Sequence, residues 1–454
     1  MIFSAMPTPY LAHPRRAALR SLGVSLSLLA VSVSAQGLLN PPGAPAPTMK
    51  SLQEISDQIG TIATAGRKPI HSPSNAVTIT QPGDYYLAGD TYALFIVVSD
   101  VTVDLNGHAL RPTSESTGLH IGGSNVRVRN GRVIGLGTAT PGANSWEVAF
   151  SGTNSIGVYT QGAVHDVRLE DITVEGFIVG INALSSGIPD NTVGLIAKNV
   201  VVRRCGHAVN TSSATIEGMH VYSCSSGALV ANYSRIRDLR IERCGSGVSA
   251  QKTTLSNVTI RHIANTGAGL SDCTVSSLDI SSAAAGLVGN GNSVSGLVSS
   301  ENRGHGVSGS NNTLQDAVAR SNVGRGFSGD ASTYQNVTAI GNGADGINGT
   351  GLNIDGAIVA SNTGHGVLAP ESVVRGVSAR FNTGAGVYAD NATISACVAR
   401  SNGDDGIRGV GSVISDCRAS GNDTNAGGYV AQGIVWTGGR VANSLADTAT
   451  PAIP

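Results

Sequence analysis

Short apolar segments alternate with polar residues through the second half of the chain, at a period of 20 residues. One apolar column of this repeat holds Val294, Leu314, Tyr334, Ile354, Val374, Ile394 and Ile414. Glycines recur in another column and are each followed by an apolar residue, as in Gly306-Val307 and Gly346-Ile347. Short alternating strands with glycine corners and few helix formers are typical of a parallel β-solenoid, in which each rung, one complete turn, buries its inner face by stacking on its neighbours.

A column of asparagines follows the same period: Asn302, Asn322, Asn342, Asn362, Asn382, Asn402 and Asn422. It predicts a hydrogen-bonded ladder at a corner, because asparagine tolerates the left-handed conformation and its amide can reach the same residue one rung away. Upstream, cysteine takes the asparagine position in the same register, at Cys205, Cys224 and Cys244.

The chain has six cysteines, an even number that in an exported protein is compatible with disulfides. The stacking of three of them in the corner ladder favours buried thiols instead. Cys397 and Cys417 lie one rung apart on the inner side, so a bridge between them is the alternative.

The repeat predicts an all-β solenoid over residues 79–433, followed by a C-terminal cap and tail over 434–454. Residues 1–35 combine Arg15, Arg16 and Arg20 with a short apolar run that ends at Ala35, which predicts a secretory signal. Residues 36–78 hold a proline-rich linker and a helix that starts at the capping box Ser51-Leu-Gln-Glu54. We expect this helix to cover the open end of the solenoid.

Composition and charge narrow the possible partners. Charged residues make up 13% of the chain and no later apolar stretch is long enough to span a bilayer, so we expect a soluble protein outside the cytoplasm with no membrane span. Removal of the signal takes away its three arginines and no acidic residue, which changes the net charge from −1 to −4. An acidic protein of this kind predicts no nucleic-acid partner.

Two outward-facing columns on the early rungs carry the candidate chemistry. Every second side chain of a solenoid strand points outward, and equivalent residues on adjacent rungs are about 4.8 Å apart. The columns therefore bring together Arg203, His220, Tyr222, Arg240, Glu242 and Arg261. Between Lys198 and Arg261 there are nine Lys or Arg residues and three acidic ones, which suggests an anionic ligand. An ordinary solvated sheet face with cross-strand ion pairs is the alternative.

The segments Asn342-Gly-Ala-Asp-Gly-Ile347 and Asp171-Ile-Thr-Val-Glu-Gly176 resemble the stacked pattern of the pectate-lyase-like superfamily. The resemblance covers residues 79–433 and implies a right-handed single-stranded parallel β-helix. It is specific for the fold and weak for activity, since this scaffold carries lyases, hydrolases, epimerases and binding proteins.

Lyases of the superfamily cleave uronic-acid polysaccharides by β-elimination, and the resemblance implies this reaction. Arg203 and Arg240 are then candidates to bind the substrate carboxylate, with His220 and Tyr222 as the acid and base. Further substrate contacts are expected from Arg261, Glu242, Arg204 and the loop residue Trp146. The alternatives are a uronate epimerase, which begins with the same proton abstraction, and a non-catalytic glycan-binding or matrix protein.

Two carboxylate groups point to other chemistry. The resemblance makes calcium a possible cofactor, with Asp171 and Glu175 as candidate ligands in the acidic cluster of the early rungs, although no fixed calcium-loop motif is present. A glycoside hydrolase needs paired carboxylates, and the nearest set is Asp345, Asp404, Asp405 and Asp423. These aspartates occupy regular, loop-free rungs, which makes hydrolysis the weaker hypothesis.

Overall fold

The computed structural model describes residues 51–55, 66–113, 116–142, 144, 147–153, 155–184, 194–422, 433–447 and 449–450. The chain forms two units, which divide between Thr61 and Ile62. In the first unit, the predicted capping box is present at the start of a short helix: the Ser51 N–H donates to Oε2 of Glu54 (2.7 Å) and the Glu54 N–H donates to Oγ of Ser51 (3.1 Å). The expected signal sequence lies outside the described residues, and the capping role of the helix stays a prediction.

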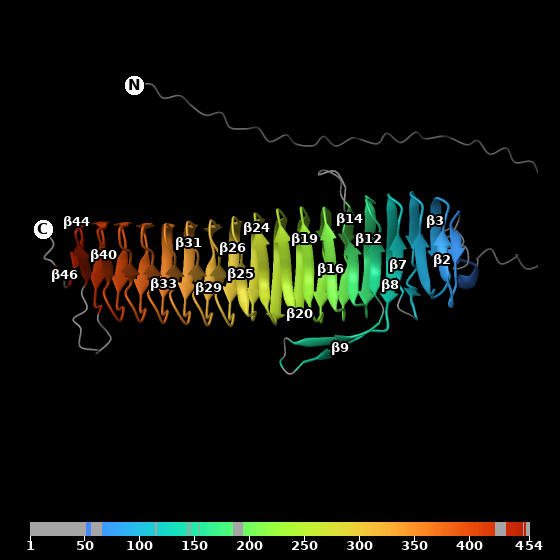
Figure 1. The fold of residues 1–454 in the computed structure, drawn as a ribbon, viewed down its shortest axis with the longest axis horizontal. Coiled ribbons are helices and arrows are strands. Elements are labelled where there is room, and N and C mark those ends of the chain that lie inside the picture. The colour runs from blue at the N-terminus through green and yellow to red at the C-terminus, as the bar shows by residue number, and fades with distance from the viewer. Residues whose placement is uncertain are drawn as a thin grey trace, which may run out of the picture. The chain divides into compact units, whose positions relative to one another are not determined.

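The second unit is a right-handed parallel β-solenoid of about 17 turns, as the repeat and the resemblance led us to expect. Figure 1 shows its strands stacked along one long axis from β2 (Ala76–Ile79) to β46 (Ala449–Thr450). Two ladders run through it. In the regular half, β31 (Thr333–Ile340) pairs with β33 (Asn353–Ala360), whereas β30 (Phe327–Ser328) pairs with β32 (Ile347–Asn348).

Three left-handed corners divide each regular rung into three straight segments. In the rung that contains β31, the corners are Ala331, Asn336 and Gly341, all with φ between 51° and 65°. Asn336 lies inside β31, so this strand bends and supplies two segments of the first ladder, sheet A. The third segment, β32, belongs to the second ladder, sheet B.

The asparagine ladder is present, but the left-handed role expected of it is wrong. The positive φ falls on the preceding residue, such as Ser321 or Ser361, and the asparagines are buried. From Asn322 onward, each amide oxygen of the column accepts from the backbone and side-chain N–H groups of the asparagine one rung earlier; the Asn362 oxygen accepts from those of Asn342 at 3.0 and 2.9 Å. The amide nitrogen donates to a buried carbonyl, that of Ala339 in the case of Asn362 (3.0 Å). The column therefore satisfies buried backbone groups where the chain turns.

Inward side chains of successive rungs form continuous apolar rows. Two such rows are buried throughout: Val200, Met219, Leu239, Val258, Leu278 and Val202, Val221, Ile241, Ile260, Ile280. All six cysteines are buried free thiols, as the stacking predicts. Cys205, Cys224 and Cys244 continue the register of the asparagine column through Ile263 and Ala283, and the Ala283 N–H donates to Oδ1 of Asn302 (3.0 Å).

Parallel pairing extends past both expected boundaries of the solenoid. β1 (Lys68–Ile70) pairs with β3 (Gly83–Leu87) before residue 79, and β43 (Ile434–Thr437) pairs with β40 (Ile407–Val410) after residue 433. These terminal strands are short, so alternation alone does not mark them. The inserted loop after Gly137 forms an antiparallel hairpin of β9 (Thr138–Pro141) and β10 (Val148–Ser151).

Candidate functional site

The strand register confirms both predicted outward columns. β15 (Val201–Arg203), β18 (His220–Tyr222), β20 (Arg235–Cys244) and β22 (Thr254–Ile263) pair in sequence within sheet A. One column runs through His220 and Arg240, and the other runs through Arg203, Tyr222, Glu242 and Arg261. The alternate residues Val202, Val221 and Ile241 are buried, so the strand geometry turns the polar set outward.

Arg203 joins two rungs through its guanidinium group. Its Nε donates to Oε2 of Glu175 (2.6 Å), which lies in β12 (Val167–Glu175), and its Nη1 donates to the hydroxyl oxygen of Tyr222 (2.7 Å). These contacts raise the pKa of Arg203, with the Tyr222 hydrogen bond as the largest cause. Because the Tyr222 oxygen accepts this bond, its own proton remains available for another acceptor.

His220 lies against Tyr222, with 4.8 Å between the ring centroids. Its Nε2 is covered by protein and lies 3.7 Å from Oε2 of Glu242, too far for a hydrogen bond. The ring is about one third exposed, so its contact with solvent is through the rest of the ring. Burial lowers the pKa of His220, and the charge of Arg240 lowers it further while that of Glu242 opposes the shift. The imidazole is therefore neutral at pH 7 and able to accept a proton.

Glu242 connects His220 with Arg240. The Nη2 of Arg240 donates to Oε1 of Glu242 (2.6 Å). Burial raises the pKa of Glu242, but the contacts with Arg240 and His220 outweigh it and the net shift is downward, which keeps the carboxylate charged. Arg240 is 59% exposed, more than Arg203 (32%) or Arg261 (47%), so of these three cations it is the most open to a ligand.

The arginines of this patch are less free than the charge count suggests. Arg261 donates to Oδ2 of Asp279 (2.7 Å), and Arg237 forms ion pairs with Glu217 and Asp238. With Arg203 and Arg240, four of the nine basic residues between Lys198 and Arg261 thus have a carboxylate partner. Much of the local positive field is neutralised within the protein itself.

Two further predicted contacts stay untested. Arg204 is exposed at a left-handed corner (φ 52°) directly after Arg203, next to the patch along the chain. Trp146 lies outside the described residues. Its neighbour in the loop, Phe150, packs over Gly137 and Gly152 at the base of the hairpin, so this aromatic ring covers its own loop.

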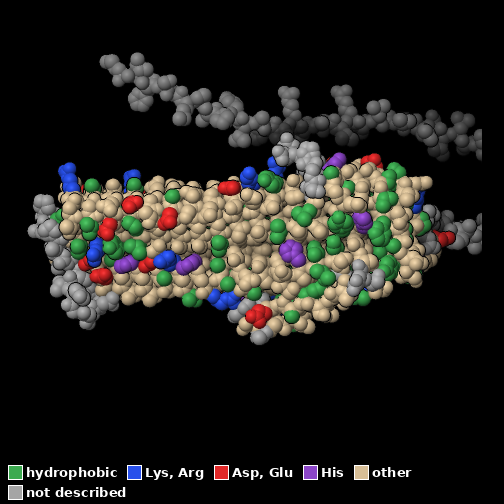
Figure 2. All heavy atoms as spheres, viewed as in Figure 1, with side chains coloured by type: hydrophobic (Ala, Val, Ile, Leu, Met, Phe, Trp, Pro, Cys, Tyr) green, Lys and Arg blue, Asp and Glu red, His purple; other side chains and the backbone are tan. Residues whose placement is uncertain are grey.

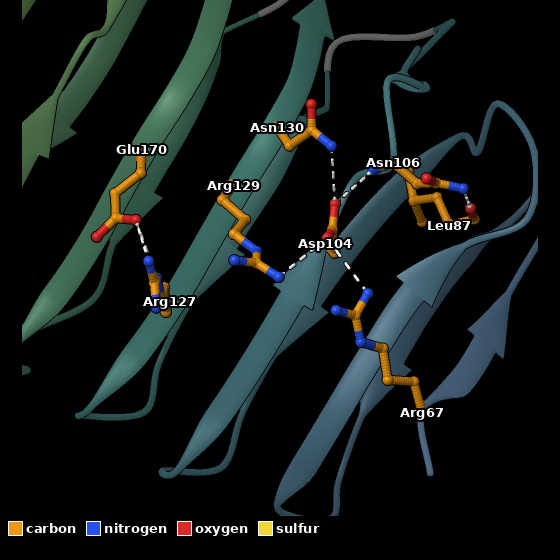
Figure 3. Close-up of polar contacts among 8 residues, drawn as sticks. All are labelled: Arg67, Leu87, Asp104, Asn106, Arg127, Arg129, Asn130 and Glu170. Atoms are coloured by element: carbon orange, nitrogen blue, oxygen red, sulfur yellow. Dashed lines mark hydrogen bonds and ion pairs between the residues drawn. The ribbon is translucent and has the colours of Figure 1, made fainter. Parts of the chain in front are cut away.

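The candidate calcium ligands have separate partners. Glu175 binds Arg203, and Oδ1 of Asp171 accepts from the amide of Asn199 (3.1 Å) at a left-handed corner. Glu170 of the same acidic cluster forms an ion pair with Arg127 (Figure 3). Within the described ranges, no group of three or more His, Cys, Asp or Glu side chains is placed to hold a metal ion.

Figure 3 also shows a carboxylate that the sequence did not single out. Asp104 is buried and accepts from the Asn106 N–H (2.9 Å) and the Asn130 amide (3.2 Å), while Arg67 and Arg129 lie 3.3 and 3.2 Å from its Oδ2. Burial raises the pKa of Asp104, but these partners lower it overall. The segment Asp104-Leu-Asn-Gly107 therefore forms a corner of the first rungs in which both carboxylate oxygens of Asp104 have partners within the protein.

Two of the carboxylates considered for hydrolysis are too far apart to act as a pair. Asp345 and Asp405 are both buried and occupy one column beside sheet B, three rungs apart, which is about 14 Å. Paired glycosidase carboxylates are roughly 5–9.5 Å apart. Asp404 is exposed and Asp423 lies outside the described residues.

Histidines of the same sheet B column have structural roles. Nδ1 of His305 accepts from the Arg325 N–H (2.9 Å) and Nδ1 of His365 accepts from the Ala385 N–H (3.0 Å). Figure 2 shows histidine side chains among charged ones towards the C-terminal end of the visible face. His207 lies earlier in the column, where its ring covers Gly227. These contacts give the histidines of this column a structural role.

Comparisons with known proteins give only distant structural matches. No family model and no curated protein matches the chain. Tailspike protein 2 of bacteriophage CBA120 is 12% identical with a TM-score of 0.33, and the match covers 63% of this chain and 44% of that one. The mannuronan C-5 epimerase AlgE6 A-module of Azotobacter vinelandii is 14% identical with a TM-score of 0.31 (76% and 90% covered).

The receptor-binding tailspike of bacteriophage Det7 is 13% identical with a TM-score of 0.37, and the match covers 84% of this chain and 77% of that one. Matches with such low identities and TM-scores do not indicate a substrate or a functional site.

No helix among the described residues is long and apolar enough to cross a membrane. By its own strand pairing the chain is a right-handed parallel β-solenoid, and its structural neighbours are β-helix tailspikes, alginate epimerases and glycoside hydrolases.

Proposed function

We propose that the outward face of β15, β18, β20 and β22 is the active site of a polysaccharide lyase that cleaves a uronate-containing polymer by β-elimination. The observation that carries the proposal is a continuous set of contacts across four rungs. It runs from Glu175 through Arg203, Tyr222 and His220 to Glu242. It places a neutral imidazole, a tyrosine hydroxyl and cationic groups on one accessible surface.

In this proposal, Arg240 binds the substrate carboxylate. It is more exposed than Arg203 and Arg261 and is directly paired with His220 on the neighbouring rung. Arginine binds carboxylates through its fork of donors, and the bound cation stabilises negative charge that develops next to the carboxylate. The proton on C5, beside the carboxylate carbon, then lies towards His220.

His220 removes the C5 proton, and its lowered pKa keeps it in the form that can accept one. The electron pair of the C5–H bond forms the C4=C5 double bond as the C4–O4 bond breaks. Tyr222 gives its hydroxyl proton to the departing oxygen, and the Arg203 N–H already bonded to its oxygen stabilises the phenolate that is left. One proton is accepted and one is given, so the step needs no further reactant.

A glycan-binding protein without catalysis is the second candidate. The observation that favours it is that Arg203, Arg240 and Arg261 each have a carboxylate partner, as on an ordinary surface with cross-strand ion pairs. A uronate epimerase would share the first proton abstraction but return a proton to C5 without breaking the C4–O4 bond.

The test is to incubate the protein with alginate, pectate, hyaluronan, chondroitin and heparin-type chains, with and without calcium. Ultraviolet absorbance reports the unsaturated uronate, and deuterium incorporation at C5 without cleavage reports epimerisation. We expect a rise in absorbance with one polymer that is lost in His220→Ala and strongly reduced in Tyr222→Phe.

Matched controls are His165→Ala and Tyr233→Phe, which change exposed residues of the same types away from the patch and should keep activity. Equal turnover in His220→Ala and the wild type would overturn the assignment. Binding of a polymer without either reaction would establish the second candidate.

A further inference from the structure

We infer that the site continues along the solenoid as one straight row of cations, which ends in a second anion-binding site at Arg380 and Arg400 and binds the same polyanionic chain. This inference rests on the proposed function for the identity of the ligand, a carboxylated polysaccharide. Its evidence comes from a different part of the molecule, the regular half of sheet A.

Register places the two sites in a single column of sheet A, in which Arg320, Arg380 and Arg400 are exposed while the small residues Ser300 and Ala360 are covered. From Arg261 it passes through Ser281 and Ser300 to Arg320, then through Ile340 and Ala360 to Arg380 and Arg400. Counted along this column, arginine stands at every third rung: Arg203, Arg261, Arg320 and Arg380. The interval is about 14 Å. Evenly spaced cations on a straight ribbon match a linear ligand with repeating charges.

Arg380 and Arg400 differ from the arginines of the first patch in having no acidic partner. They are directly paired in β36 (Ser378–Arg380) and β39 (Val398–Arg400), and both are exposed. Neither guanidinium has an ion pair or side-chain hydrogen bond with any residue in the described ranges. Like charges directly opposite each other on adjacent strands are destabilising. A bound anion would remove this repulsion.

The arginine pair borders a hollow of about 270 Å³ on the surface of the solenoid. Its lining also includes Ser378, Ser401 and Phe381. Phe381 is 61% exposed at a left-handed corner. A large apolar side chain is unusual at such a backbone position and gains little there from burial. Two cations, two hydroxyl groups and an aromatic ring suit a carboxylated sugar, because the guanidinium groups bind the acid group and the phenyl ring packs on the sugar face.

Distance decides how the two sites cooperate. Tyr222 and Arg380 are eight rungs apart in the column, about 38 Å. A polymer longer than this span contacts both sites at once, and the second contact becomes intramolecular, which multiplies the apparent affinity. A shorter fragment reaches only one of them.

The test measures binding of pectate and alginate, as long chains and as fragments shorter than the span, to the His220→Ala protein at low ionic strength. Arg380→Gln and Arg400→Gln are then added together. We expect long chains to lose at least about tenfold in affinity, while fragments bound at the first patch lose little. The matched control is Lys68→Gln with Lys252→Asn, which removes two exposed positive charges away from the column.

The outcomes separate the two proposals. The second site alone would be overturned if the wild type catalyses elimination but the variant with Arg380→Gln and Arg400→Gln binds long chains as tightly as before. Arginine-dependent binding without elimination would overturn the lyase and leave the second site. Equal losses in the lysine control, or tighter binding of single-stranded DNA than of either uronate polymer, would reduce the arginine pair to a general charge effect and overturn the inference.

Discussion

At the scale of single residues, the candidate chemistry depends on how neighbouring rungs set the charge of His220. Arg240 and Glu242 come from the next rung, and their charges act on the imidazole in opposite directions. Burial of the ring is the largest effect and lowers the pKa below the ordinary value of 6.5. The pKa of His220 therefore depends on burial of the ring and on the charges of Arg240 and Glu242.

We expect two charge-removing substitutions to move the pKa of His220 in opposite directions. Glu242→Gln removes the negative charge that raises the pKa and should lower it further, whereas Arg240→Gln removes the positive charge that lowers the pKa and should raise it. An NMR titration of the His220 ring measures both shifts without needing a substrate. Shifts of the same sign would contradict the geometry of the patch.

If His220 is the base, the pH profile of kcat/KM follows from its state. The rate rises with pH through the His220 pKa, which is below 6.5, and then levels off. The midpoint of this rise should move to lower pH in Glu242→Gln, parallel to the NMR shift. A rise that stays at the same pH in that variant would assign the base to another residue.

Partly buried histidines make the stability of the solenoid depend on pH. Burial lowers the pKa of His207, and its Nε2 is covered with no hydrogen-bond partner among the described residues. The unfolded chain therefore binds the proton more tightly, so stability is lost as pH falls from about 6.5 through the folded-state pKa. We expect a lower thermal midpoint at pH 5.5 than at 7.5, with a smaller drop in His207→Gln and an unchanged drop in the exposed-histidine control His165→Gln. An equal drop in His207→Gln would contradict this account.

At the scale of elements, the asparagine ladder fixes the corner between sheet A and sheet B. Asn362→Ala removes the acceptor of the Asn342 N–H and the donor to the Ala339 carbonyl, both buried. Leaving these backbone groups unpaired should cost about 3 kcal/mol. Unfolding of a repeat protein need not be two-state, so hydrogen exchange at residue 342 is the sharper measurement. Protection equal to that of the exposed variant Asn353→Ala would show that the ladder is dispensable.

Glycine recurs in the repeat because neighbouring rungs approach closely. A Cβ on Gly366 would lie 2.5 Å from the carbonyl oxygen of Gly386, whereas one on Gly269 would meet nothing closer than 3.9 Å. We expect Gly366→Ala to lower the thermal midpoint strongly and Gly269→Ala to leave it unchanged or raise it slightly. Differential scanning calorimetry compares the two, and equal effects would mean that the spacing of rungs adjusts freely.

The repeat predicted the elements well because a solenoid is determined by local alternation. Rung length, inner rows and outward columns all follow from the period, so Arg203, His220, Tyr222 and Glu242 meet as expected. The period does not reveal which carboxylate an arginine binds, since side-chain conformation decides that. It also placed the left-handed corner one residue too late in the chain. The residue before each asparagine adopts the positive φ, and the asparagine amide is instead hydrogen-bonded to buried backbone groups.

At the scale of the whole molecule, the outward face of sheet A runs without a break in register from the early rungs to the regular rungs. The early rungs hold His220 and Tyr222, and the regular rungs continue the same column to Arg380 and Arg400. A repeat that looks purely structural in the sequence therefore carries an extended surface in register with the candidate active site. We therefore expect the polymer to lie along the solenoid axis on this face.

The most direct measurement is a crystal structure of the His220→Ala protein with a uronate oligosaccharide from the polymer that binds. We expect sugar density along the outward column of sheet A, with a carboxylate against Arg240 and the C5 position facing residue 220. Density on sheet B, or on sheet A with no carboxylate near Arg240, would contradict this expectation.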